Sequence, residues 1–277
     1  MKRLRFLPFV KHNKAASYTI SALIMTAVTV ALVVAAFAYA YQMLDQQRGM
    51  SEWEIAKKSL LAFNDALETV AWKTGATRST RFTAQYGYLQ LIPNNMSITI
   101  TANVNGAPQS LSNTTYPGRT GMIQYWLGTK YVSYEPGYEL YFLGNNSTMI
   151  SSSSDSYGRA VINQPPNLGL VSMTLDYRVR AMKTSVIDVL GVPTNYVDIW
   201  VIKISMLKAT AWSYVNEFDL QAKTLSVTTA PYRFTEVTTA TSTVTVQIGS
   251  RSSQVPITLV PGTVVYNVIV ANVQVSV

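Results

Sequence analysis

The sequence predicts an α+β protein, in which one long N-terminal hydrophobic helix precedes a mostly antiparallel, β-sandwich-like ectodomain. Residues 15–44 carry no charged side chain, which indicates the helix. Residues 76–277 contain short runs of alternating polar and apolar residues separated by Gly, Pro, Asn and Ser, which is typical of strands and turns. The composition agrees, because the chain has 17 tyrosines and only 13% charged residues.

Residues 16–44 predict a helix that lies in a membrane. As an α-helix, residues 15–44 would extend about 45 Å, which exceeds the roughly 30 Å hydrocarbon core of a bilayer. The leader, residues 1–15, is basic, and the first acidic residue is Asp45. By the positive-inside rule the leader stays in the cytoplasm. We therefore expect a membrane-anchored chain with an extracellular C-terminal region at the cell surface.

Three interpretations of this segment are open. It is a buried helix of a soluble protein, a secretory signal cleaved after Ala38-Tyr39-Ala40, or a helix that the mature protein keeps. We favour the third, because the apolar stretch is longer than the 7–15 residues, roughly, of a signal-peptide core.

The segment Lys14-Ala15-Ala16-Ser17-Tyr18-Thr19-Ile20 resembles the processing site of archaeal type IV pilins and archaellins. The sequence GATRSTRF, which begins at Gly75, resembles the first hairpin of archaeal pilin-like envelope proteins. The resemblance implies cleavage between Ala15 and Ala16 by a prepilin peptidase, with Lys14 and Ala15 as the last two leader residues. It also implies that the apolar helix packs with other copies in the core of a type IV pilus.

Small and apolar side chains on this helix are the candidates for the contact between copies, since small residues permit close helix approach. The predicted assembly residues are Ile20, Leu23, Ala27, Ala31, Ala35 and Phe37. We expect a homo-oligomer built through them.

Residues 45–75 predict a polar break followed by an amphipathic stalk helix. The break is DQQRGM, residues 45–50 with Gly49, and Ser51 and Glu54 have capping-box spacing. An apolar seam follows, and Gly75 is the expected stop. The seam either docks on the chain's own domain or forms a short coiled coil; its residues are Trp53, Ala56, Leu60, Phe63, Leu67 and Val70.

Residues 76–277 predict the β-rich extracellular region, either one domain or two units near residues 76–165 and 166–277. A hairpin across Pro93-Asn94-Asn95 and an exposed loop over residues 144–158 are expected. The other expectations are strand-like segments that flank a connection at residues 191–195 and strands at residues 243–248, 255–260 and 264–277.

The sequence argues against several chemistries. The chain has no cysteine, and its only histidine, His12, lies in the leader, so no His-based triad or His/Cys metal site is expected in the ectodomain. Five of the eight net positive charges lie in the leader, which leaves no basic stripe for nucleic acid. We expect no enzyme and no cofactor; a carboxylate pair at Glu217 and Asp219 is the remaining hydrolase alternative, and Asp198 is expected beside a turn.

Asn-x-Ser/Thr tripeptides predict a glycoprotein. The glycosylation candidates are Asn95, Asn113, Asn145 and Asn146. Aromatic residues crowd positions 125–142, either as sheet packing or as a surface for sugar or subunit contact. Together with the apolar helix, the resemblance to archaeal pilins implies a pilin-like filament subunit. The alternative is a single-span envelope protein or adhesin that functions in cell adhesion and does not polymerise.

Overall fold

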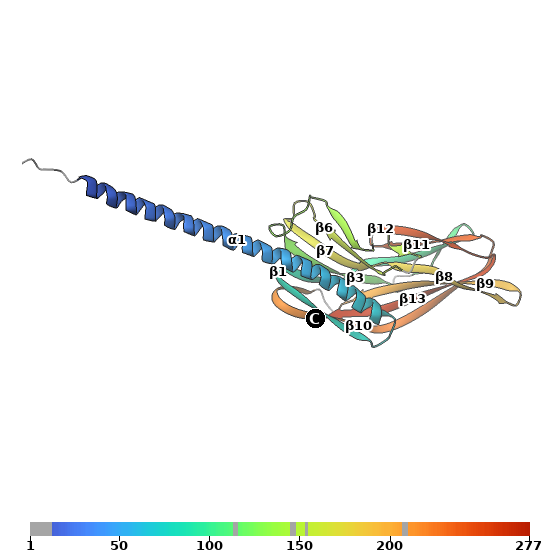
Figure 1. The fold of residues 1–277 in the computed structure, drawn as a ribbon. Coiled ribbons are helices and arrows are strands. Elements are labelled where there is room, and N and C mark those ends of the chain that lie inside the picture. Colours follow the sequence, from blue (N-terminus) through green and yellow to red (C-terminus); the bar gives the residue numbers. More distant parts are fainter. Residues whose placement is uncertain (1–12, 113–115, 145–147, 153–154, 207–209) are drawn as a thin grey trace, which may run out of the picture. The chain divides into compact units, whose positions relative to one another are not determined.

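The computed structural model describes residues 13–112, 116–144, 148–152, 155–206 and 210–277, with side chains outside residues 13–17 and 210–216 (Figure 1). One helix, α1, spans Asn13–Ala71. The strands are β1 Thr77–Val104, β2 Ala107–Ser110, β3 Arg119–Gly128, β4 Glu139–Leu143, β5 Ile150–Ser151, β6 Gly158–Asn163, β7 Leu170–Tyr177, β8 Val179–Val189, β9 Val192–Ser205, β10 Thr210–Val237, β11 Thr241–Ile248, β12 Arg251–Thr258 and β13 Gly262–Ser276. The chain forms two compact units that divide between Arg48 and Gly49, so α1 contributes to both.

The helix α1 continues through residues 45–50, so the predicted polar break is wrong. Gly49 lies inside the helix and is buried. A Cβ atom on Gly49 would lie only 2.3 Å from Cδ1 of Tyr131. The glycine therefore admits the Tyr131 ring rather than ending a helix. The helix ends at Ala71, and Gly75, with φ +79°, lies in the turn that follows.

The apolar seam packs on the β domain, which confirms the interpretation that it docks on the chain's own domain. All six seam residues are buried, at 2% exposure or less. Phe63 meets Phe82 of β1 edge to face, and the Trp53 ring lies 6.1 Å from that of Tyr125 in β3. Each large apolar side chain buried in this way contributes roughly 1.5–3 kcal/mol. Residues 49–71 are consequently part of the domain core rather than a stalk.

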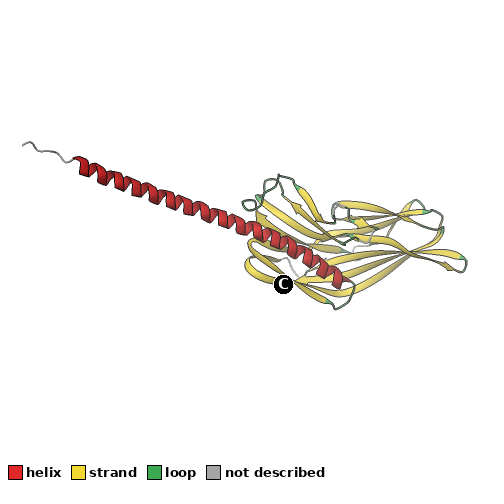
Figure 2. Ribbon diagram, viewed as in Figure 1, coloured by secondary structure: helices red, strands yellow, loops and turns green. Residues whose placement is uncertain are grey.

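The strands form one hydrogen-bonded network of mostly antiparallel pairs (Figure 2). The main order is β4-β6-β7-β3-β1-β10-β13-β9-β8-β5, and the hairpin β11–β12 and strand β2 attach to β1. Two pairs, β9–β13 and β5–β8, are parallel. The α+β class is confirmed, whereas the β-sandwich stays a prediction.

The predicted hairpin across Pro93-Asn94-Asn95 is wrong, because residues 86–101 belong to the single strand β1. The strand changes partner there instead. Tyr88–Ile92 pair with β3, whereas Ile98–Ala102 pair with β11. A register shift between Ile92 and Met96, with Asn94 at φ +48°, accommodates the Pro-Asn-Asn segment as an irregularity within the strand.

Strands at the predicted C-terminal positions are present as β11, β12 and β13, with β12 beginning four residues early at Arg251. The connection expected at residues 191–195 is shorter, since β8 and β9 join through Leu190 and Gly191 alone. Strand β10, 28 residues long, was not predicted. The expected exposed loop at residues 144–158 is wrong in part, because Met149 and Ile150 are buried.

Two hydrophobic clusters fill the domain. One packs the seam of α1 against β1, β3, β7 and the C-terminal part of β13. The other lies beneath the β11–β12 hairpin, against β8, β9 and the N-terminal part of β13. Both clusters contain residues from before and after position 165, and residues 49–277 form one compact unit.

Candidate functional site

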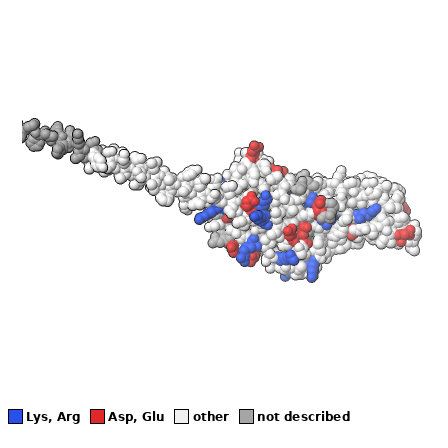
Figure 3. All heavy atoms as spheres, in the orientation of Figure 1, with Lys and Arg blue, Asp and Glu red and all other residues white. Residues whose placement is uncertain are grey.

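The first candidate site is the apolar surface of α1 before the β domain. Every residue from 18 to 44 is exposed, and this helix is long and apolar enough to cross a membrane. None of residues 18–44 is Lys, Arg, Asp or Glu, so the described side chains before Asp45 carry no charge (Figure 3). The interpretation as a helix buried inside a soluble domain is therefore wrong for this structure.

Two threonine hydroxyl groups on this surface are hydrogen-bonded within the helix. Thr26 Oγ1 donates to the carbonyl oxygens of Ala22 and Leu23 at 3.1 and 3.0 Å. Thr29 Oγ1 donates to the carbonyl of Met25 at 2.8 Å. These bonds remove the demand of both hydroxyls for water, which suits an apolar environment.

The predicted assembly residues are all exposed. At 100° per residue, Ala27, Ala31 and Ala35 follow one face of the helix, with Ile20 and Leu23 on the same side. Phe37 lies off that face. Five of the six predicted assembly residues therefore lie on one side of the helix.

The predicted processing residues Lys14, Ala15 and Ala16 lie in the first turns of α1. Their side chains and residues 1–12 lie outside the part that the structure describes. Cleavage between Ala15 and Ala16 would leave almost the whole of α1 on the mature chain.

The second candidate is a buried carboxylate that joins α1 to the sheet. Glu52, at 5% exposure, lies within the helix. Its neighbours Ser51 and Glu54 do so too, so the predicted capping box at a helix start is wrong. The Glu52 carboxylate accepts backbone N–H bonds from Gln85 at 3.1 Å, Tyr86 at 3.0 Å and Gly87 at 2.9 Å. The hydroxyl of Tyr125 donates to Oε1 at 2.5 Å. Burial and this hydrogen bond raise the pKa of Tyr125 far above its ordinary value, so the phenol stays protonated.

Gly87 is required for this arrangement. A Cβ atom here would lie 2.3 Å from the Tyr125 hydroxyl oxygen and 2.4 Å from the carbonyl oxygen of Trp126. The Gly87 N–H therefore approaches the carboxylate only because the residue has no side chain. One turn before the helix ends, Glu68 repeats the pattern, since Oε1 accepts from the N–H of Gly158 at 3.0 Å and from Ser156.

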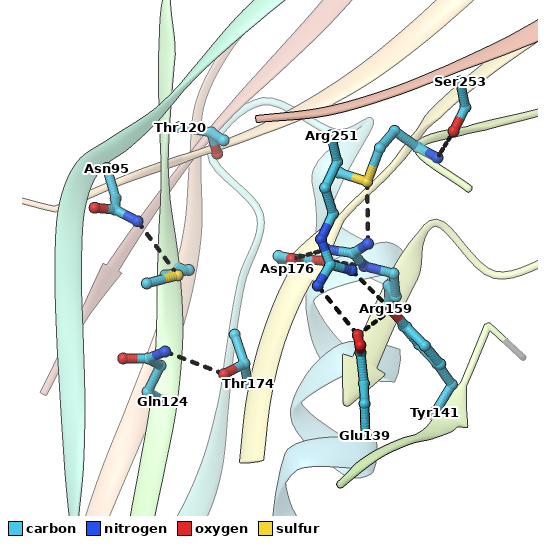
Figure 4. Close-up of polar contacts among 12 residues, drawn as sticks. Asn95, Thr120, Gln124, Glu139, Tyr141, Arg159, Thr174, Asp176, Arg251 and Ser253 are labelled. Carbon is cyan, nitrogen blue, oxygen red and sulfur yellow. Dashed lines mark hydrogen bonds and ion pairs between the residues drawn. The ribbon is translucent and has the colours of Figure 1, made fainter. Parts of the chain in front are cut away.

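The third candidate is a polar cleft of 440 Å³ between the sheet and the β11–β12 turn (Figure 4). Side chains at alternate positions of β3, β6 and β7 form its floor. They include Gln124, Asn163, Thr174, Arg159 and Asp176. Gln124 Nε2 donates to Thr174 Oγ1 at 3.1 Å. Arg159 and Asp176 are opposite each other in register and form a bidentate, buried ion pair, with Nε to Oδ1 at 2.7 Å.

The rim of the polar cleft holds a second charge pair. Arg251 donates to the Tyr141 hydroxyl at 2.7 Å and to Glu139 Oε1 at 3.1 Å, and Tyr141 donates to the same carboxylate (Figure 4). The bond from Tyr141, and then the bonds from Arg251, hold the pKa of Glu139 below its ordinary value although partial burial opposes them. The charges of both pairs cancel, so the groups left for a ligand are mainly neutral amides and hydroxyls.

The fourth candidate, the aromatic cleft, has a volume of 660 Å³. The rings of Tyr88 and Trp126 stack at 6.3 Å, and those of Tyr86 and Tyr131 meet edge to face at 5.2 Å. Lys130 lies at its margin, with Nζ 4.3 Å from the Tyr131 ring centroid. The aromatic residues at positions 125–142 therefore have different roles: Tyr125 is part of the core, whereas Trp126 and Tyr131 line the aromatic cleft.

Asn95 lines the polar cleft, whereas the other described sequence candidates lie apart from these clefts. Asn95 is exposed on β1, whereas Asn113, Asn145 and Asn146 fall outside the described residues. Glu217 and Asp219 both bind the exposed Arg81, at 3.3 and 3.4 Å. Asp198 lies within β9 rather than beside a turn, and accepts from Asn267 at 2.8 Å. Among the described residues no cluster of three acidic or histidine side chains could hold a metal ion.

Sequence reasoning missed both the Glu52 contact and the polar cleft. The alternation of polar residues along β7, Ser172, Thr174 and Asp176, is the signal that could have indicated a polar sheet face. The partners of Glu52 lie more than thirty residues away, so no local pattern reveals them.

No protein-family model, no curated protein and no solved structure matches this chain. The structure shows a β-rich domain preceded by one N-terminal helix that is long and apolar enough to span a membrane.

Proposed function

We propose that this chain is a pilin-like structural subunit of a cell-surface filament, with the apolar part of α1 in the filament core and the β domain outward. The observation that carries the proposal is the exposed, uncharged surface of residues 18–44 on a helix whose later residues are built into the domain. Such a surface is unfavourable in water and must be covered by lipid or by other protein.

Two features favour assembly over a plain anchor. The apolar stretch exceeds the roughly 30 Å that one bilayer requires. The face with Ala27, Ala31 and Ala35 allows a second helix to approach closely. Before assembly the helix lies in the membrane, and after processing by a prepilin peptidase it packs with other copies. The β domain acts as a structural and not a catalytic element.

The test is N-terminal sequencing of the mature protein together with its recovery after shearing. Full-length chain is produced in cells that hold a prepilin peptidase, and sheared filaments are collected from the medium. The expected N-terminus is Ala16, with the chain in the filament fraction. Lys14→Glu blocks this processing, whereas Lys11→Glu, also in the basic leader, serves as its matched control.

An N-terminus at Met1 or at Tyr41, with all protein in the membrane fraction, contradicts the proposal.

A second variant pair tests the helix contact. Ala31→Phe is expected to abolish filaments without preventing membrane insertion, because a large ring on the small-residue face prevents close packing. Val33→Phe, on the other side of the helix, leaves filaments intact.

The polar cleft favours a second candidate, a single-span envelope protein or adhesin that does not polymerise. Neutral amide and hydroxyl groups beside the Trp126 ring suit a polyhydroxylated ligand such as a surface carbohydrate. Binding of glycans to the full chain, lost on Gln124→Ala and combined with an uncut leader, would favour this candidate.

A further inference from the structure

Exposed apolar residues of the β domain gather at the tip of the β8–β9 hairpin. The tip, residues 186–192, exposes five large apolar side chains within seven positions; these are Val186, Ile187, Val189, Leu190 and Val192. Figure 1 shows the hairpin projecting at one end of the domain. A concentration of this kind on a soluble surface marks a contact with another molecule.

The turn of this hairpin places a leucine in a backbone conformation that leucine disfavours. Leu190 has φ +55° and Gly191 has φ +82°, the conformation of a two-residue hairpin turn that favours Asn-Gly. Leucine is disfavoured in this left-handed region, and the Leu190 side chain is 99% exposed, so neither backbone nor packing explains it. The turn is held by Asp188 Oδ1, which accepts from the Gly191 N–H at 2.7 Å.

The aromatic cleft lies at the other end of the domain. Its wall residues Leu127 and Tyr131 belong to the hydrophobic cluster around the α1 seam, whereas Val197 of β9, nearer the tip, belongs to the other cluster. Strand β9 alone extends 14 residues from the tip, about 46 Å at 3.3 Å per residue. One chain therefore cannot fill its own cleft with its own tip.

We propose that the tip of one copy inserts into the aromatic cleft of a second copy, with Leu190 against the rings of Tyr88 and Trp126. The surfaces match in character, because an apolar projection meets an open cleft of 660 Å³ with aromatic walls. They also match in charge, since Asp188 at the tip would face Lys130 at the margin of the cleft.

Such a contact joins two different surfaces of the same molecule and so repeats head to tail. A head-to-tail contact that does not close into a ring generates an open filament. The inference rests on the proposed filament function and names the partner of the β domain as a second copy of this chain.

Disulfide trapping tests the contact cleanly, because the natural chain has no cysteine. Full-length chain with Leu190→Cys and Leu170→Cys, the latter in the cleft wall, is oxidised on cells and in sheared filaments. A ladder of covalent multimers on a non-reducing gel is expected. Leu190→Cys with Leu225→Cys, an exposed position on β10 outside the cleft, should give no ladder.

The substitution Leu190→Asn gives the energetic test. Asparagine suits the turn, so thermal stability should hold or rise, whereas the yield of sheared filaments should fall roughly tenfold or more because a central apolar anchor is lost. Leu225→Asn is the control and keeps the yield. Filaments without a ladder, or Leu190→Asn at full yield, overturn the contact but leave the filament function standing. Absence of wild-type filaments overturns that function instead, and a ladder on whole cells would still support the contact.

Discussion

The hydroxyl of Tyr125 in β3 lies 2.5 Å from Oε1 of Glu52 in α1, and both side chains are buried. The same carboxylate binds three consecutive backbone N–H groups of β1. One helical side chain therefore fixes the helix on two neighbouring strands at once. Glu52 thus adds a polar contact to the apolar seam that holds this part of α1 on the sheet.

Removal of this carboxylate should destabilise the domain strongly. Glu52→Ala leaves the N–H groups of residues 85–87 and the Tyr125 hydroxyl without an acceptor, at a cost of about 3 kcal/mol or more. Thermal unfolding of the full chain in detergent, followed by circular dichroism, measures the loss. Glu54→Ala is the control, since Glu54 is exposed on the same helix. Equal melting temperatures for both variants would contradict the assignment.

Gly49→Ala separates helix propensity from packing. Alanine inside a helix is favoured over glycine by about 1 kcal/mol. The new Cβ would however meet the Tyr131 ring at 2.3 Å, and overpacking of this kind costs roughly 1–3 kcal/mol. We expect a net loss of stability that Tyr131→Ala in the same chain partly relieves. A double-mutant cycle on melting temperature checks the coupling, and a stabilised single variant would refute the close contact.

The buried pair Arg159–Asp176 should behave as a unit. Removing one partner by Arg159→Met or Asp176→Leu leaves a buried charge unpaired, which typically costs about 3–5 kcal/mol. The double variant should lose less than either single variant, because no charge remains. Denaturant unfolding measures all three. Additive losses would show that the pair does not act as drawn in Figure 4.

Asn95 is the glycosylation candidate that the structure places in solvent. If the chain is exported past a glycosylating enzyme, we expect peptides containing Asn95 to carry a glycan in protein from the native cell. Ser97→Ala removes the acceptor pattern and should remove the added mass, whereas Asn94→Gln should leave it. Fully unmodified Asn95 in mass spectra counts against the prediction.

Local periodicity predicted the helical part well. The seam from Trp53 to Val70 was identified residue by residue, because burial of one helix face imposes a strict spacing. The β11–β13 region was also predicted, since alternation and Gly-containing turns mark each strand. These signals are carried by residues close together in the sequence.

The wrong and missing predictions concern features that depend on contacts between residues far apart in the sequence. Gly49 suggested a break, but its role is set by Tyr131, some eighty residues later. Pro93-Asn94-Asn95 suggested a hairpin, whereas β1 merely exchanges β3 for β11 as its partner there. Strand β10 was overlooked because Pro231 in its sequence argues against a strand, although Pro231 pairs with Asn267 of β13 in the structure. The aromatic cleft joins residues of three strands and the polar cleft residues of six, which no single stretch of sequence displays.

The position of β13 within the network sets the order in which the molecule is built. This strand follows every other described strand in the chain, yet it lies between β10 and β9 near the middle of the sheet. The sheet therefore cannot close during synthesis until β13 has emerged, while the helix leaves the ribosome first. The part of the cluster around the α1 seam that comes from β13 is made some two hundred residues after the helix. Until then the nascent chain exposes part of its apolar core, and exposed apolar surface of this kind promotes aggregation.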